Sequence, residues 1–248
     1  MIVIANCANA QGLSKYGKIS TDAATSVNKN GVIGSSIANN QNGKQVTIYE
    51  QVTSTTGKIW MDRNLGATRV ATSNTDYLAY GSLYQWGRGS DGHQLIDYIN
   101  DFVGDPVNGT TLTLSTSDTP NDALFIMPSA SPFDWRSGQN ASLWQGVNGI
   151  NNPCPSGYRI PTEIELNAER LAFSTMDDAG AFASPHKLPI PGYRHLSDGT
   201  MNGTSSFGYY WSSTVNGAEV QVLYFRIGFA GMIAADRAFG LSVRCIKN

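Results

Sequence analysis

The C-terminal part of the chain, 208–248, carries both a strong strand pattern and a conspicuous irregularity. Residues 209–211 are aromatic and typical of a strand, and 241–246 alternate as expected for a second strand. Between them, over 227–239, large apolar residues stand among glycine and alanine with neither helical nor strand periodicity. This pattern predicts an irregular loop, whose large side chains either pack into a core or are displayed for binding.

Hydrophobic alternation begins at residue 46, and the preceding residues are mostly small and polar. The pattern over 46–52 predicts a strand, 54–57 a turn and 58–61 a second strand, which together make a hairpin. Residues 1–45 have little to bury and are predicted to be a polar extension or stalk with at most short strands. The globular domain is therefore expected at 46–248.

The middle of the chain predicts short elements and long loops. Aromatic and apolar residues at three- and four-residue spacing over 76–87 predict a short amphipathic helix, with Asn74 or Thr75 near its cap. The next segment, 88–150, is irregular, and strand patterns return over 188–215 around a Ser-Asp-Gly turn. Few helices, small antiparallel sheets and long loops indicate an α+β fold.

The clearest helix signal starts at Thr162. This threonine is the expected N-cap, and Glu165 is the third helical residue, so the two predict a capping box. The buried stripe of the helix is expected to consist of Ile164, Ala168 and Leu171.

Composition narrows the classes of function. Charged residues make up 15% of the chain and the net charge is −2, which gives no basic face for nucleic acid. No apolar run approaches the roughly 18 residues of a membrane helix. Abundant aromatic residues with little charge suit an extracellular binding domain, and equally a well-packed β-rich core.

Three cysteines bear on the location of the protein. Cys154 and Cys245 lie 91 positions apart and form either a disulfide or two buried thiols. Cys7 stands in a context that resembles the end of a lipoprotein signal, where it would carry a lipid anchor. An ordinary N-terminal strand fits the same residues, so the role of Cys7 stays open.

No catalytic or metal-binding pattern stands out, and no cofactor is expected. His93, His186 and His195 lack the spacing of metal ligands. Asp177 and Asp178 form an acidic pair, which would bind calcium or simply face solvent.

Several phrases, in order, resemble one family. They are WMDRNL at 60–65, YGSLYQW at 80–86, CPSGYRIPT at 154–162, YWSS at 210–213 and SVRC at 242–245. The series resembles the Fibrobacter succinogenes major paralogous domain, which is similar to the formylglycine-generating-enzyme type of C-type-lectin-like fold. The resemblance covers 46–248. It implies that Trp60, Trp86 and Trp211 fill the core, and that Arg63, Arg194 and Arg244 brace buried loops.

A narrower resemblance concerns the C-terminus, which is similar to the variable region of proteins diversified by diversity-generating retroelements. The implied fixed frame is Leu223, Phe225, Ala230, Met232, Arg237, Ala238, Gly240, Ser242, Val243, Arg244 and Cys245. The implied ligand-binding surface, within 220–239, consists of Val222, Tyr224, Arg226, Ile227, Phe229, Gly231, Ile233, Ala234, Ala235, Asp236 and Phe239, with Gly228 among them.

These resemblances imply a non-enzymatic ligand- or receptor-binding protein outside the cell. It would be a phage tail-fibre tip, as a homotrimer, or an adhesin on a bacterial surface. The partner would be a protein or glycan receptor on a cell surface. The alternatives are an enzyme of the formylglycine-generating type and a structural surface module without a specific ligand.

Overall fold

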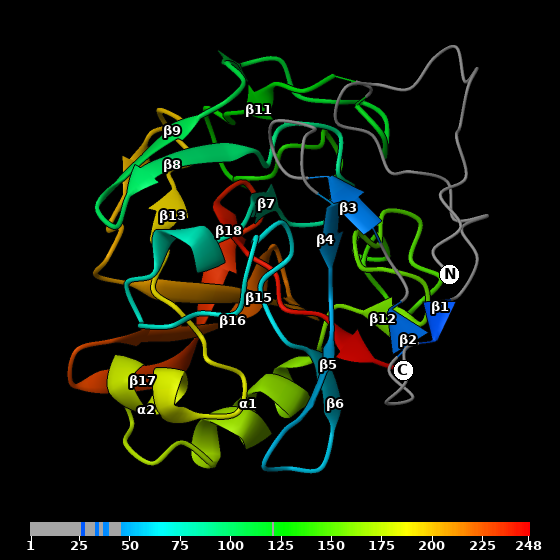
Figure 1. Ribbon diagram of the computed structural model, residues 1–248. Coiled ribbons are helices and arrows are strands. Elements are labelled where there is room, and N and C mark those ends of the chain that lie inside the picture. Colours follow the sequence, from blue (N-terminus) through cyan, green and yellow to red (C-terminus); the bar gives the residue numbers. More distant parts are fainter. Residues whose placement is uncertain (1–25, 28–32, 35–36, 40–45, 121) are drawn as a thin grey trace.

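A computed structural model describes residues 26–27, 33–34, 37–39, 46–120 and 122–248 (Figure 1). Most of the proposed extension at 1–45, including Cys7, lies outside the described residues. The parts of it that are described are short strands. Two of them pair with each other, and the third pairs with the strand that begins at Val46.

The described residues form a mixed α+β structure of many short strands and two α-helices. The strands up to residue 111 are β1 (Ser26–Val27), β2 (Ile33–Gly34), β3 (Ile37–Asn39), β4 (Val46–Ile48), β5 (Gln51–Thr53), β6 (Ile59–Met61), β7 (Leu83–Gln85), β8 (Ile96–Asn100), β9 (Val103–Pro106) and β10 (Thr110–Thr111). Those that follow are β11 (Phe125–Ile126), β12 (Tyr158–Arg159), β13 (Tyr193–Arg194), β14 (Met201–Asn202), β15 (Gly208–Asn216), β16 (Glu219–Arg226), β17 (Phe229–Asp236), β18 (Gly240–Ser242) and β19 (Ile246–Lys247). The helices are α1 (Glu163–Leu171), α2 (Asp178–Ala183) and the 3₁₀ helix η1 (Tyr77–Ala79).

The largest sheet has seven strands, and its long part is an antiparallel meander of β15, β16 and β17. The strand order is β14-β13-β18-β15-β16-β17, and β7 also pairs with β18. Two-residue turns at 217–218 and 227–228 join the three long strands. Gly217 (φ 61°) and Gly228 (φ 71°) adopt the left-handed backbone conformation in these turns, which glycine takes without steric cost.

The segment 227–239 is not the irregular loop that its sequence predicts, because most of it is strand β17. Every residue of β17 pairs with β16, from Phe229 opposite Arg226 to Asp236 opposite Glu219. Both faces of the strand pack against apolar residues. Ala230 and Met232 pack against the cluster beneath the helices, and Ile233 and Ala235 pack against the cluster on the other face of the sheet. Apolar residues on both faces remove the alternation by which a strand is recognised.

The four-stranded sheet β12-β19-β6-β5 contains the predicted hairpin, with β5 and β6 joined by the turn at 54–57. The last strand, β19, pairs with β6 through Ile246 and Trp60. The predicted single strand at 241–246 is therefore wrong. The chain leaves β18 and enters β19 in another sheet, because the backbone carbonyls of Val243 and Cys245 accept hydrogen bonds from Leu65 and Met61.

Helix α1 begins as predicted but buries a different face. Thr162 and Glu165 form the capping box. The predicted stripe of Ile164, Ala168 and Leu171 is wrong, since all three face solvent and Ile164 is 80% exposed. The buried side chains are Leu166 and Glu169. Glu169 is buried because its Oε1 accepts hydrogen bonds from the hydroxyls of Ser54 (2.6 Å) and Thr56, which lie far away in sequence.

Replacing Thr162 with alanine is expected to lower the free energy of unfolding by about 1 kcal/mol, because it removes the N-cap hydrogen bond to Glu165. Ile164→Ala is the matched control. Its side chain is exposed, so it should change the free energy by less than about 0.5 kcal/mol in urea unfolding. The reverse order of the two effects would contradict the burial described for α1.

Two further local predictions differ from the structure. Residues 76–87 form only the 3₁₀ helix η1 and strand β7, because Gly81, with φ of 74°, ends the helical backbone. Over 188–215, strand structure starts only at β13, since Pro189 and Pro191 lack the N–H that a strand ladder needs.

The acidic pair at 177–178 turns out to be structural. Asp177 caps α2 by accepting a hydrogen bond from the backbone N–H of Gly180. Asp178 is buried and accepts a hydrogen bond from the side-chain amide of Asn74 (2.7 Å).

The core follows the sequence expectation for the large aromatic residues. Trp60, Trp86 and Trp211 are each at most 1% exposed. Arg194 and Arg244 are also buried, and Arg194 donates hydrogen bonds to the carbonyls of three separate loops. Arg63 donates to Asp62 and to the carbonyl of Thr68. These arginines therefore brace loops, as the resemblance implies.

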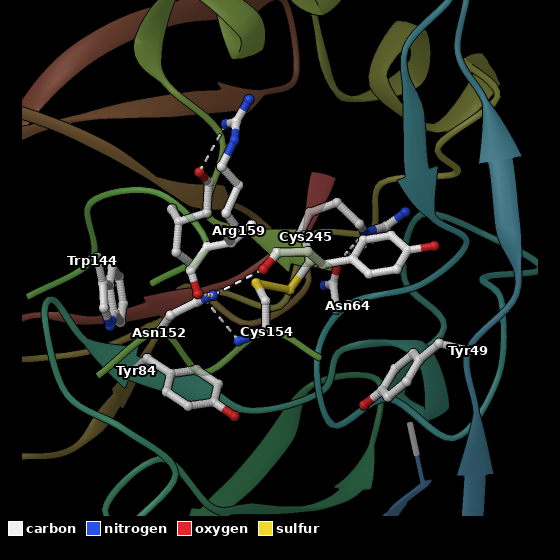
Figure 2. Close-up of a disulfide and its surroundings, with 12 residues drawn as sticks. Tyr49, Asn64, Tyr84, Trp144, Asn152, Cys154, Arg159 and Cys245 are labelled. Carbon is white, nitrogen blue, oxygen red and sulfur yellow. Dashed lines mark hydrogen bonds between the residues drawn. A yellow bond between two sulfur atoms is a disulfide. The ribbon is translucent and has the colours of Figure 1, made fainter. Parts of the chain in front are cut away.

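Cys154 and Cys245 form a disulfide with a Cα–Cα distance of 5.9 Å, which resolves the alternative left open by the sequence. Figure 2 shows the bond among aromatic side chains, including Tyr84 and Trp144. The side chain of Asn152 holds the neighbouring backbone by bonding to the N–H of Cys154 and the carbonyl of Tyr158. A structural disulfide is consistent with an oxidising location outside the cytoplasm.

Candidate ligand-binding surface

The candidate surface lies on one face of the β15–β16–β17 meander. The face toward α1 and α2 is packed with Tyr210, Leu223 and Phe225, and the helices lie against this side of the sheet in Figure 1. The middle of the opposite face is also core, where Trp211 and Val220 are buried. The rest of that opposite face, along β17 and at the ends of the strands, is partly exposed.

Seven partly exposed rings form a continuous cluster on this face, here called the aromatic surface. Tyr209 stacks on Tyr224 with centroids 4.6 Å apart, and Phe229 continues the row 5.7 Å from Tyr224. On the other side, Tyr193 lies 5.2 Å from Tyr209 and 5.8 Å from Phe239. The remaining two rings, which contact these, belong to His195 and Phe207.

Beside this cluster the surface is hollowed by a pocket of about 190 Å³, called the hollow below. Its lining residues are mainly aromatic and aliphatic, and two of them are acidic. The lining residues are Tyr193, Tyr209, Glu219, Ile233, Ala234, Ala235, Asp236, Phe239 and Leu241. A concave, mostly apolar site with a few polar groups is the usual form of a binding pocket.

Two ionisable groups near the hollow have shifted pKa values, those of Asp236 and Tyr209. Glu219 and Asp236 lie directly opposite each other on β16 and β17. Partial burial, and secondly the charge of Glu219, raise the pKa of Asp236 above its ordinary value. Burial, and secondly the neighbouring Tyr224, raise the pKa of the Tyr209 hydroxyl, so this ring is a neutral phenol at neutral pH.

The structure brings most of the sequence-predicted binding residues to this face. Five of them line the hollow, namely Ile233, Ala234, Ala235, Asp236 and Phe239. Tyr224 and Phe229 belong to the aromatic surface. Arg226 and Ile227 are exposed at the β16–β17 turn, and Ile227 is 80% exposed.

Gly231 and Val222 have other roles than direct display. A Cβ on Gly231 would lie 2.7 Å from the ring of Phe229, so this glycine is the floor beneath that ring. Val222 is 0% exposed and packs in the core with Trp211. Its predicted place in the binding surface is wrong, because its position in β16 points it into the covered middle of the face.

Four rings of the aromatic surface were missed by sequence reasoning. They are Tyr193, His195, Phe207 and Tyr209, which come from β13, the following turn, the segment before β15, and β15 itself. A signal was present only for Tyr209, which alternates with the buried Tyr210 in a recognisable strand. Tyr193 and His195 come close to the meander only through the β13–β18–β15 pairing, whereas Phe207 directly precedes β15.

Comparisons with protein-family models, with curated proteins and with solved structures find no match to this chain. The family resemblance therefore rests on the sequence motifs alone. No helix in the described part of the chain is long and apolar enough to cross a membrane. Across the same residues, no three His, Cys, Asp or Glu side chains are grouped so as to hold a metal ion.

Proposed function

We propose that this chain is a non-enzymatic recognition protein with a C-type-lectin-like fold, which binds a cell-surface receptor through the aromatic surface and the hollow. The observation that carries the proposal is the continuous contact of seven partly exposed rings on one sheet face. Exposed aromatic clusters of this kind are typical of interaction surfaces, where rigid rings supply most of the binding energy.

The implied fixed positions and the positions between them differ in burial, and this difference supports diversification of the C-terminal segment. Of the frame positions implied by the resemblance, all except the partly buried Met232 are buried. Of the intervening positions, all except Val222 are partly or fully exposed. A protein that varies its binding residues on a constant scaffold needs this division.

The dimensions favour a macromolecular partner. The pair Arg226 and Phe229 lies at one end of the β16–β17 hairpin, and the pair Glu219 and Asp236 lies seven residues away at the other. At about 3.4 Å per residue the surface is roughly 24 Å long, comparable to one side of a protein interface. A phage tail-fibre tip or a bacterial surface adhesin would present such a face outside the cell, where a disulfide is stable.

The state of the cysteines supports a recognition role over the enzyme alternative. An enzyme of the formylglycine-generating type would need reactive cysteines, whereas Cys154 and Cys245 are buried and bonded to each other. Turnover of a cysteine-containing peptide by the purified protein would overturn the proposal. A neighbouring reverse transcriptase gene, with a near-copy of the last coding segment that differs only at adenines, would establish diversification.

Phe229→Ala is expected to weaken partner binding at least tenfold while changing the free energy of unfolding by less than about 1 kcal/mol, because the ring is 42% exposed. Binding is measured with the intact chain on arrays of cell-surface glycans and proteins. Phe102→Ala, on the β8–β9 hairpin and 73% exposed, is the matched control and should bind normally. Equal binding by the two variants would contradict the proposed surface.

Val222→Ala tests the partition between core and surface. It should lower the free energy of unfolding by about 2 kcal/mol, because the side chain is fully buried beside Trp211. Urea unfolding of this variant beside Phe229→Ala measures the difference. A smaller loss for Val222→Ala than for Phe229→Ala would reverse the assignment of the two positions.

A further inference from the structure

Helix α1 has apolar side chains on two opposite faces. On the inner face, Leu166 packs into the core. On the outer face, Ile164, Ala168 and Leu171 are exposed, Ile164 to 80% and Leu171 to 60%. At about 100° per residue, these three lie nearly opposite Leu166 and the buried Glu169; they are called the outer stripe below. Surface helices normally turn polar residues to solvent, so a second apolar stripe on α1 indicates a surface that another molecule covers.

One flank of the outer stripe carries two opposite charges. Glu163, Asn167 and Arg170 recur at the same spacing as the stripe, one residue earlier, so they share the flank beside it. The carboxylate of Glu163 has no hydrogen-bond or ion-pair partner among the described residues. Arg170 is oriented within its own chain, since Nε donates to Asn167 (2.9 Å) and Nη1 to the carbonyl of Ala230 (3.3 Å). Its Nη2 donates to none of the described residues. The flank therefore presents an acid at the start of the helix and a base near its end.

We propose that the outer stripe binds a second copy of this chain, with the two α1 helices packed antiparallel across a two-fold axis near Ala168. In this arrangement Ile164 of each copy packs against Leu171 of the other, and the small Ala168 at the centre lets the helices approach closely. Each contact then occurs twice, as in any two-fold interface.

The charges select the antiparallel arrangement. In an antiparallel helix pair the same flank of both helices meets, so Glu163 of each copy lies beside Arg170 of the other. A parallel pair would bring like ends together. The opposite flank has no open charge to contribute, because Glu165 is already paired with Arg159 at 2.7 Å. A different partner of uniformly positive or negative charge would be attracted at one end of the stripe and repelled at the other, whereas a reversed copy is attracted at both.

The size of the stripe sets the strength of the dimer. With nine residues, α1 is about 14 Å long, and Met176, 42% exposed, extends the apolar surface beyond its end. A standard interface buries about 800 Å² on each partner, which is more than one such helix offers. We therefore expect a weak, reversible dimer.

Dimerisation through α1 leaves the aromatic surface free. The helices cover one face of the β15–β16–β17 meander, and the aromatic rings lie on the other. A dimer would present two recognition surfaces at a fixed separation, which strengthens binding to a receptor that is displayed in many copies. The dimer itself requires no receptor, so its test is independent of the recognition function.

Analytical ultracentrifugation of the full chain, from about 10 μM to about 1 mM, tests the inference over the range in which a small interface dissociates. We expect a reversible equilibrium between one and two chains. Ala168→Glu places two carboxylates at the axis and should abolish association without unfolding the exposed site. Ala179→Glu, at an exposed alanine of α2, is the matched control and should dimerise normally. A chain that stays monomeric throughout, a trimer, or association that survives Ala168→Glu would overturn the inference.

Charge reversal tests the antiparallel arrangement. Glu163→Arg and Arg170→Glu should each weaken self-association about three- to tenfold, because two attractive pairs become repulsive. An equimolar mixture of the two variants should associate more tightly than either alone, since each chain supplies the charges that the other lacks. A variant that merely folded poorly would not recover on mixing. Asp105→Arg, at an exposed acid of β9, makes the same change in net charge as Glu163→Arg and should leave the dimer intact. A mixture no tighter than the separate variants would overturn the proposed interface.

Discussion

Replacing Arg244 with alanine should lower the free energy of unfolding by about 3–5 kcal/mol, one of the two largest effects expected for this protein. The guanidinium is buried and donates to the side-chain oxygen of Asn64 (2.9 Å), and to the carbonyls of His186 (2.7 Å) and Met61 (3.3 Å). Alanine would leave these buried acceptors without a donor, and each such loss costs about 1–3 kcal/mol.

The arrangement around Arg244 explains why one residue matters so much. Its contacts join the loop after β6, the loop after α2 and the segment between β18 and β19. Burial lowers the pKa of Arg244 to about 10, so the guanidinium remains charged at neutral pH although neutral oxygens surround it. The same Asn64 also donates to Tyr80 and Tyr210, so the loss would spread through a shared network.

Two controls sharpen the Arg244 experiment. Arg226→Ala removes an exposed arginine at the β16–β17 turn and should change stability by less than about 0.5 kcal/mol in urea unfolding. Arg244→Lys keeps the charge but replaces the planar fork with a single ammonium, so it should recover only part of the loss. Full recovery by lysine would mean that charge, and not the directed hydrogen bonds, holds these loops.

Removing the disulfide with the double substitution Cys154→Ala and Cys245→Ala should cost about 4 kcal/mol. The bond closes a loop over 91 positions, for which the chain-entropy relation gives about 4–5 kcal/mol. For a domain of this size, that corresponds to a melting temperature lower by about 8–16 °C. The bond also joins the segment before α1 to the segment before β19, which local hydrogen bonds alone would leave less constrained.

Thermal unfolding with and without a reductant tests this prediction. The wild-type protein should lose stability in reductant, and the double variant should be insensitive to it. A double variant within 1 kcal/mol of the oxidised wild-type protein would show that other contacts already restrict the unfolded loop.

The sequence predicted an element correctly where all the residues that decide its structure lie within one short segment. The β5–β6 hairpin is specified by alternation and a glycine turn. The capping box of Thr162 and Glu165 lies within four residues. Strand β15 is predicted by its consecutive aromatic residues. In each case no distant residue is needed to decide the local structure.

Sequence reasoning failed where distant residues decide. The sequence of α1 predicts burial for Ile164, because nothing within the helix shows which face is covered. Ser54 and Thr56, distant in sequence, lie against the opposite face of the helix and donate hydrogen bonds to Glu169 there. Strand β17 looked irregular because the helices cover one of its faces and the aromatic surface the other. The position of Val222 was misjudged for the same reason, since only the three-dimensional register shows which face is covered.

The binding residues lie on paired strands and not on a free loop. Whether a position tolerates substitution therefore depends on which face of the sheet its side chain occupies. Within β17, Phe229, Gly231, Ile233 and Ala235 share one face, and their neighbours Ala230 and Met232 face the helices. The two-residue turns also leave no room to lengthen the hairpin without breaking its register. A combinatorial library built on this scaffold would therefore gain usable members by randomising the exposed positions at constant length, and would mostly lose folded members by randomising positions such as Ala230, which is buried toward the helices.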